Sequence, residues 1–210
     1  MPHEFHTPHE FLTGLTSVKF KISKDYLLSL RYYLLFAALI FIFSVGWGYL
    51  FAKDYPVEVQ KVLQDLQRVL EPIKEMSEMQ QVFFIFLNNS VTGFLAIFLG
   101  PVLGIFPFSI LLANGGMMGI MFFLSEENEV LSAFFTGIFP HGIIEIPVLI
   151  FCGAMGIKIG KLVIKKIFKR KGDIKNELIS GLKFFFKVLV PLLLLASVIE
   201  VFITQRLLII

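Results

Sequence analysis

The fold is decided by residues 130–157, which read VLSAFFTGIFPHGIIEIPVLIFCGAMGI. The stretch is apolar over more than the roughly 20 residues that a helix needs to cross the hydrocarbon core of a bilayer. It nevertheless contains an imidazole and a carboxylate, His141 and Glu145, one helical turn apart and flanked by Pro140 and Pro147. Ionisable groups are costly inside a membrane, and those that are kept there usually serve a function. The sequence therefore predicts a membrane-spanning segment that carries a functional polar site.

The composition of the whole chain indicates an integral membrane protein. Apolar residues make up 56% of the 210 residues, and the mean hydropathy is +0.80. Both values lie outside the range of ordinary soluble domains. Four further segments are long and apolar enough to span a bilayer, namely 32–51, 82–99, 102–124 and 184–203. We therefore predict an all-α, polytopic helical bundle with about five transmembrane helices, in which residues 31–210 form a single transmembrane domain behind a polar tail, 1–30.

The distribution of charge predicts how the chain is oriented. Lys and Arg residues gather in the tail 1–30 and in the segment 158–183, whereas acids outnumber bases in 53–81 and three glutamates occur in 125–129. Basic residues are enriched in the cytoplasmic loops of membrane proteins. We therefore expect a multi-pass protein of the cell membrane with a cytoplasmic N-terminus, a basic cytoplasmic loop at 158–183 and an extracytoplasmic C-terminus.

The basic loop is expected to contact the anionic headgroups of the lipid bilayer, because lysines at a membrane surface extend toward them. The expected contacts are Lys158, Lys161, Lys165, Lys166, Lys169 and Arg170. No nucleic-acid partner is predicted, since neither stacking aromatic residues nor a known binding motif accompanies the charge.

The segment 53–81 predicts an extracytoplasmic amphipathic helix. Its opposite face mixes charges of both signs, whereas a helix that binds anionic lipid is mainly basic. We therefore expect its apolar seam to pack against its own domain or a second copy of the chain, with a homodimer favoured, or to bind another membrane or extracytoplasmic protein. Pro72 is expected to kink or divide the helix. The seam consists of Val59, Val62, Leu66, Val69, Ile73 and Met76.

Three residues predict that the fourth span is broken or re-entrant, and they leave open whether it is one kinked helix or a re-entrant pair. Pro147 lacks the amide that would bond to the carbonyl of Ile143, and Pro140 and Gly142 weaken the preceding turn. Irregular backbone at membrane depth occurs where it lines a cavity. A break here would therefore direct polar backbone groups toward an internal site.

Side chains from two neighbouring spans are expected to complete that site. Asn88 and Asn89 lie in the second span and Asn114 in the third, at depths that allow them to meet His141 and Glu145. This combination suits a proton, a divalent metal or another cation, with His141 and Glu145 as candidate metal ligands. Alternatively, these groups satisfy one another as interhelical hydrogen bonds. No catalytic residue is predicted, because motifs such as His-Glu-x-x-His and Gly-x-Ser-x-Gly do not occur.

The polar motifs of the spans also resemble those of a known family. The motifs are Asn88-Asn89, Asn114-Gly115 and Pro140-His141-Gly142-x-x-Glu145-Ile146-Pro147. Their order and placement are similar to those of the stage II sporulation protein M family of polytopic membrane proteins, over roughly residues 31–206. The resemblance implies an all-helical membrane domain and, in spore-forming bacteria, a scaffold that anchors cell-wall-degrading partners during engulfment. Homologues also occur in archaea and in bacteria that form no spores.

Three functions follow as hypotheses from the residues and the resemblance together. The first is a non-enzymatic scaffold that organises a membrane complex. The second is a small cation or proton channel or transporter that uses the polar site of the spans. The third is an intramembrane metal-dependent hydrolase, which would need more ligands than His141 and Glu145.

Overall fold

The computed structural model describes residues 24–127, 131–168 and 172–204, and within these ranges the chain is helices joined by short turns, without strands. The elements are α2 (Lys24–Asp54), α3 (Pro56–Lys74), α4 (Glu78–Phe98), α5 (Ile105–Glu127), α6 (Leu131–Ile167), α7 (Ile174–Phe184), η1 (Phe185–Leu189), α8 (Val190–Ile199) and η2 (Glu200–Thr204). Five helical stretches are long and apolar enough to cross a membrane. The prediction of an all-α bundle with five spans is confirmed.

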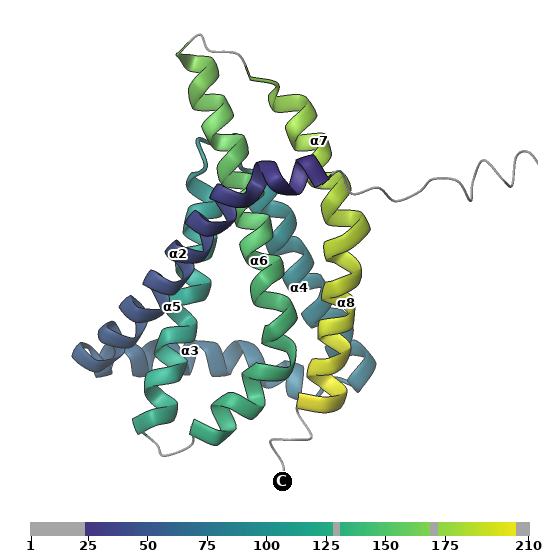
Figure 1. The fold of residues 1–210 in the computed structure, drawn as a ribbon. Coiled ribbons are helices and arrows are strands. Elements are labelled where there is room, and N and C mark those ends of the chain that lie inside the picture. Colours follow the sequence, from purple (N-terminus) through teal and green to yellow (C-terminus); the bar gives the residue numbers. More distant parts are fainter. Residues whose placement is uncertain (1–23, 128–130, 169–171, 205–210) are drawn as a thin grey trace, which may run out of the picture.

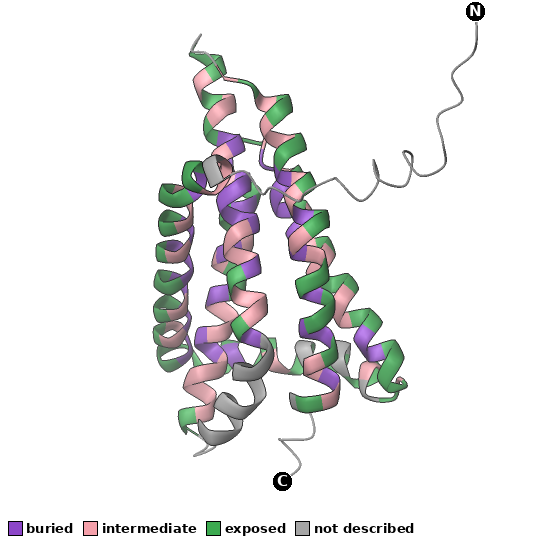
Figure 2. Cartoon of the chain, turned by 45° about the vertical axis from the view of Figure 1, so that its right-hand side comes forward, coloured by how far each residue is buried: buried purple, intermediate pink, exposed green. Residues whose placement is uncertain are grey.

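The bundle is built around α6, which packs against α2, α4, α5 and α8 (Figure 1). The amphipathic helix α3 runs crosswise over one end of the bundle, and α7 lies at the opposite end (Figure 1). We call these the α3 end and the α7 end. Buried residues face the centre of the bundle, whereas much of its outer surface is exposed (Figure 2). The exposed surface includes large apolar side chains such as Leu39, Phe43 and Leu195, as expected for helices that face lipid.

Glycines allow the spans to approach each other closely. A Cβ atom on Gly48 of α2 would lie 2.1 Å from the carbonyl oxygen of Gly116 in α5, and one on Gly156 of α6 would lie 2.0 Å from that of Ala96 in α4. Only glycine fits at such distances. The hydroxyl of Ser44 adds a hydrogen bond from α2 to the carbonyl of Leu112 in α5. Small residues and interhelical hydrogen bonds are the usual means of holding membrane helices together.

The helix boundaries follow local capping chemistry. Ser77 caps α4, and its backbone amide donates to the Gln80 side chain at 2.9 Å. The carboxylate of Asp173 caps α7 by accepting from the amide of Asn176 at 3.0 Å. Between α4 and α5 the chain turns through Gly104, whose φ of +75° favours glycine.

The fourth span is neither broken nor re-entrant, and of the two forms left open by the sequence it has the kinked single helix. Residues Leu131–Ile167 form one helix, which bends in its N-terminal part (Figure 1). A proline removes a single helical hydrogen bond, and a helix can tolerate this by bending. Pro147 lies on the exposed side of α6, where a bend disturbs no packing, and Gly142 is buried within the helix. The side chain of Pro140 lies outside the described residues.

Other expected segments differ from the structure in extent. The basic segment 158–183 is mostly helical, because α6 continues to Ile167 and α7 begins at Ile174. The segment 53–81 contains α3 and the start of α4, and Pro72 lies in the last turn of α3 without dividing it. Within the expected seam, Val59 is buried against Ala52 and Ile120 of the bundle. Val62 is exposed, Ile73 and Met76 are half-buried, and the side chains of Leu66 and Val69 lie outside the described residues.

Candidate functional site

A hydrogen bond between two spans is the centre of the candidate site. The side-chain amide of Asn89 in α4 donates to the carboxylate of Glu145 in α6, with 2.5 Å between Nδ2 and Oε1. Both side chains are half-buried. A carboxylate within a span is costly unless polar groups or water compensate it. The bond to Asn89 supplies one such partner.

A cavity of about 240 Å³ surrounds this pair. Thr92 and Asn114 also contribute to its walls, so polar groups from three helices meet there. The walls are otherwise mainly apolar and come from all five spans. These remaining lining residues are Phe41, Gly93, Met117, Met118, Met121, Gly142, Ile146, Val148, Leu149 and Leu193.

The cavity extends from the middle of the bundle toward the α3 end. At 1.5 Å per residue, Asn114 lies about 14 Å from the first residue of α5, and Met121 lies about 9 Å from its last. Toward the α7 end, side chains that follow the cavity along α4, α5 and α6 are packed with at most 1% exposure. They are Ala96, Ile97, Leu111, Cys152 and Met155. These packed residues bound the cavity toward the α7 end.

The structure brings together only some of the five expected site residues. Asn89, Asn114 and Glu145 line the one cavity. Asn114 uses its amide to donate to the carbonyl of Ile110 in its own helix at 2.8 Å. Asn88 is exposed and does not line the cavity; its amide nitrogen lies 3.5 Å from Oδ1 of Asn89. The side chain of His141 lies outside the described residues.

The expected metal site at His141 and Glu145 therefore stays a prediction. Among the described residues, no group of three or more His, Cys, Asp or Glu side chains could hold a metal ion. A catalytic zinc site usually has three protein ligands. The carboxylate of Glu145 can accept a proton. With the side-chain oxygen of Asn89 it can also contribute two ligands to a cation whose other ligands come from outside the protein.

The comparison with known proteins identifies the family. The family model described as stage II sporulation protein M matches residues 37–205, from within α2 to the end of the last span. The chain belongs to the stage II sporulation protein M family. The resemblance seen in the sequence is thereby confirmed, and this member of the family is a polytopic helical membrane protein. Searches of curated proteins and of solved structures give no match.

Sequence reasoning missed the apolar part of this family member's cavity. Met117, Met118 and Met121 follow Asn114 at intervals of three, four and seven residues, which places them on one face of a helix. That spacing was a readable signal, but methionines in an apolar segment ordinarily indicate packing. Phe41 carried no signal, since it is one of 25 phenylalanines in the chain.

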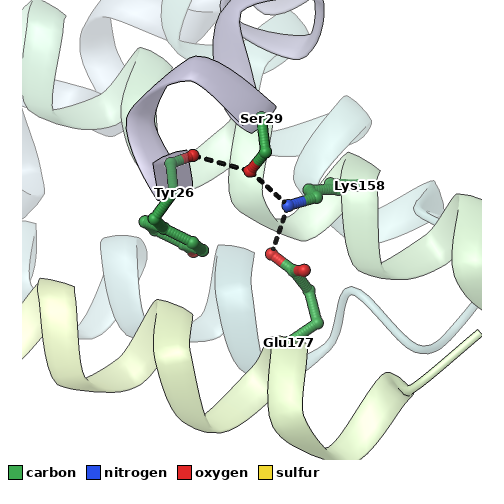
Figure 3. Close-up of polar contacts among 4 residues, drawn as sticks. All are labelled: Tyr26, Ser29, Lys158 and Glu177. Carbon is green, nitrogen blue, oxygen red and sulfur yellow. Dashed lines mark hydrogen bonds and ion pairs between the residues drawn. The ribbon is translucent and has the colours of Figure 1, made fainter. Parts of the chain in front are cut away.

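A second polar cluster lies at the α7 end and was also missed. The ammonium of Lys158 in α6 lies 2.8 Å from the carboxylate of Glu177 in α7 and donates to the hydroxyl of Ser29 in α2 at 2.7 Å (Figure 3). It also lies 5.2 Å from the ring centroid of Tyr26. The side chains of Lys158 and Glu177 are only 12% and 16% exposed. The cluster therefore joins α2, α6 and α7, and Lys158 is engaged inside the protein.

Proposed function

We propose that this protein is a membrane scaffold that organises partner proteins at the α3 end of the bundle. The supporting observation is that α3 contacts the bundle's apolar cluster through Val59 and Leu63 while other apolar side chains stay exposed. Val57 and Val62 are 60% and 37% exposed. An amphipathic helix with exposed apolar residues and charges of both signs suits a protein partner better than an anionic lipid surface.

The proposed partner is a second copy of this chain, or another membrane or extracytoplasmic protein. The basic residues of the α7 end favour a cytoplasmic location for that end. In this orientation α3 and the C-terminus are extracytoplasmic, and the N-terminus is cytoplasmic. The partner would then approach the bundle from outside the cell membrane.

The scaffold is tested by matched charge substitutions on α3. Val62→Glu places a carboxylate on an exposed apolar position, and Gln64→Glu adds a similar side chain at an exposed polar position of the same helix. We expect Val62→Glu to reduce the dimer fraction, or the partner that co-purifies from native membranes, by about tenfold, because a central apolar contact carries much of an interface's affinity. Gln64→Glu should retain the partner.

Size measurement of the purified protein in detergent and quantitative mass spectrometry of the co-purified proteins provide the readout. Equal association of both variants would exclude the exposed side of α3 as the partner surface. A wild-type chain that is monomeric and purifies from native membranes without a partner would contradict the scaffold itself.

A second candidate function is a small cation or proton transporter, and the Asn89–Glu145 pair in a cavity between the spans favours it. A carboxylate in such a cavity can take up a cation or a proton. Transport would then require the packed layer at Ala96, Leu111 and Cys152 to open toward the α7 end. For the third hypothesis, a metal-dependent hydrolase, the described residues provide no group of three ligands.

Flux measurements in proteoliposomes test the transporter. Glu145→Gln preserves the size of the side chain and removes its negative charge, and we expect it to abolish flux of protons or of monovalent cations. Glu127→Gln, an exposed carboxylate at the end of α5, is the matched control and should leave flux unchanged. His141→Ala tests the second ionisable residue of the motif. Flux that is equal in the wild type and in Glu145→Gln would exclude a transport role for this site.

A further inference from the structure

A groove on the outer surface of the bundle, at the α7 end, is independent of the site described above. It consists of two adjoining cavities of about 290 Å³ and 470 Å³ that share Phe36 of α2 with Ile157 and Lys161 of α6. One cavity reaches Tyr32, and the other reaches Phe108 of α5. The groove therefore lies where α2, α5 and α6 meet, and a lysine stands in the part common to both cavities.

The walls of the groove are apolar and open to the surroundings. Phe36 is 50% exposed and Phe108 is 40% exposed. Both residues belong to spans, so the surroundings at this level are the hydrocarbon of the bilayer rather than water. An elongated apolar groove on the lipid-facing surface matches an acyl chain in shape and chemistry.

Two cations lie at the groove. Lys161 lines both cavities, and Arg31 lies against Tyr32, which lines one of them. The ammonium of Lys161 lies 5.3 Å from the ring centroid of Tyr33, and the guanidinium of Arg31 lies 4.5 Å from that of Tyr32. Arg31 also donates to the hydroxyl of Tyr32 at 2.9 Å. Tyrosines with this amphipathic placement are typical of the headgroup level of a membrane. The rings hold both cations beside the groove without neutralising them.

Lys161 differs from Lys158 in the partners of its ammonium group. Lys158 lies less than one turn earlier on α6. Lys158 is paired with Glu177 (Figure 3), and the carboxylate of Asp173 caps α7. No carboxylate of the described residues pairs with Lys161. An anion from outside the chain is therefore the natural partner of Lys161, whereas Lys158 is not available for one.

We propose that this groove binds one anionic phospholipid of the leaflet at the α7 end. The headgroup phosphate lies between Lys161 and Arg31, and one acyl chain runs along Phe36 toward Phe108. Basic pockets between membrane helices recognise anionic headgroups in this way. The sequence predicted headgroup contacts along the whole basic segment, and this proposal assigns one of them to a defined site. The proposal does not depend on the scaffold or the transporter.

The test measures lipid retention by the full-length protein. The protein is purified in detergent, titrated with dioleoylphosphatidylglycerol or dioleoylphosphatidylcholine, and analysed by native mass spectrometry and thermal unfolding. We expect one phosphatidylglycerol to bind with saturation and to raise the unfolding temperature, and phosphatidylcholine to bind more weakly. Lys161→Gln should weaken phosphatidylglycerol binding by about fivefold, the loss expected for one basic contact at an anionic surface.

Lys175→Gln is the matched control, because Lys175 is an exposed lysine at the same end of the bundle that does not line the groove. It should bind phosphatidylglycerol as the wild type does. Phe36→Ala removes an exposed wall of the groove and should weaken binding of the lipid without affecting the lysine. Equal loss in Lys161→Gln and Lys175→Gln would show diffuse surface attraction and overturn the proposal. Equal binding of both lipids, or equal stabilisation by inorganic phosphate alone, would overturn it as well.

Discussion

The bond from Asn89 to Glu145 connects two spans at a position where few polar partners exist. Interhelical hydrogen bonds in membrane proteins contribute modestly, because the unfolded chain within the bilayer also finds partners. We expect Asn89→Ala to lower the free energy of unfolding by about 1 kcal/mol. Unfolding by denaturing detergent, followed by circular dichroism, measures this change.

Asn88→Ala is the natural control for Asn89→Ala. The two asparagines are adjacent, but Asn88 is exposed and its contact to Asn89 is 3.5 Å long, at the limit of a hydrogen bond. Its replacement should leave stability unchanged. If both variants unfold alike, the bond at 2.5 Å contributes nothing beyond the loss of a polar side chain.

Single residues differ in how far the sequence reveals their role. Asn89, Asn114 and Glu145 could be predicted because a polar residue in an apolar span is conspicuous. Phe41 and Met117 could not, because their chemistry is that of the rest of the span. The pair formed by Lys158 and Glu177 was hidden for another reason: both residues lie in a charged segment where solvated side chains are the ordinary expectation.

At the scale of helices, the sequence predicted the number of spans and the amphipathic character of α3, but not the ends of the helices. Hydropathy reports the thickness of the hydrocarbon core and is insensitive to a helix that continues into water. This explains why α6 has 37 residues and extends over part of the expected basic loop. The sequence could not distinguish a kink from a break in α6, because prolines occur at both.

The packing of α2 against α5 can be tested with two glycines of one helix. A Cβ on Gly48 would lie 2.1 Å from the carbonyl oxygen of Gly116, whereas a Cβ on Gly46 would have nothing within 4 Å. Gly48→Ala must push the helices apart, and we expect it to destabilise the protein by about 3 kcal/mol. Gly46→Ala should be neutral or slightly stabilising, because alanine is the better helix former. Unfolding in detergent distinguishes them, and similar stabilities would mean that α2 and α5 do not meet at Gly48.

At the scale of the whole molecule, the ion pair between Lys158 and Glu177 connects α7 to the bundle. Lys158→Met leaves the Glu177 carboxylate without its cation in a poorly exposed position, which costs about 3 kcal/mol when the charge remains buried. We expect faster hydrogen exchange of the α7 amides in this variant. Adding Glu177→Leu should restore much of the protection, because a well-packed apolar pair can replace an ion pair. If exchange at α7 is unchanged in Lys158→Met, the pair does not hold this helix.

The orientation of the bundle in the membrane can be determined by labelling introduced cysteines, because the chain has a single cysteine of its own. Cys152 is fully buried, so a membrane-impermeant maleimide should not label the wild type in intact cells. Gln64→Cys on α3 and Lys175→Cys on α7 introduce exposed thiols at opposite ends. Because the α7 end carries the unbalanced basic charge, we expect Gln64→Cys to be labelled from outside and Lys175→Cys only after the membrane is permeabilised. The reverse pattern would place α3 in the cytoplasm and contradict the proposed extracytoplasmic partner, while labelling of both in intact cells would contradict a membrane between the two ends.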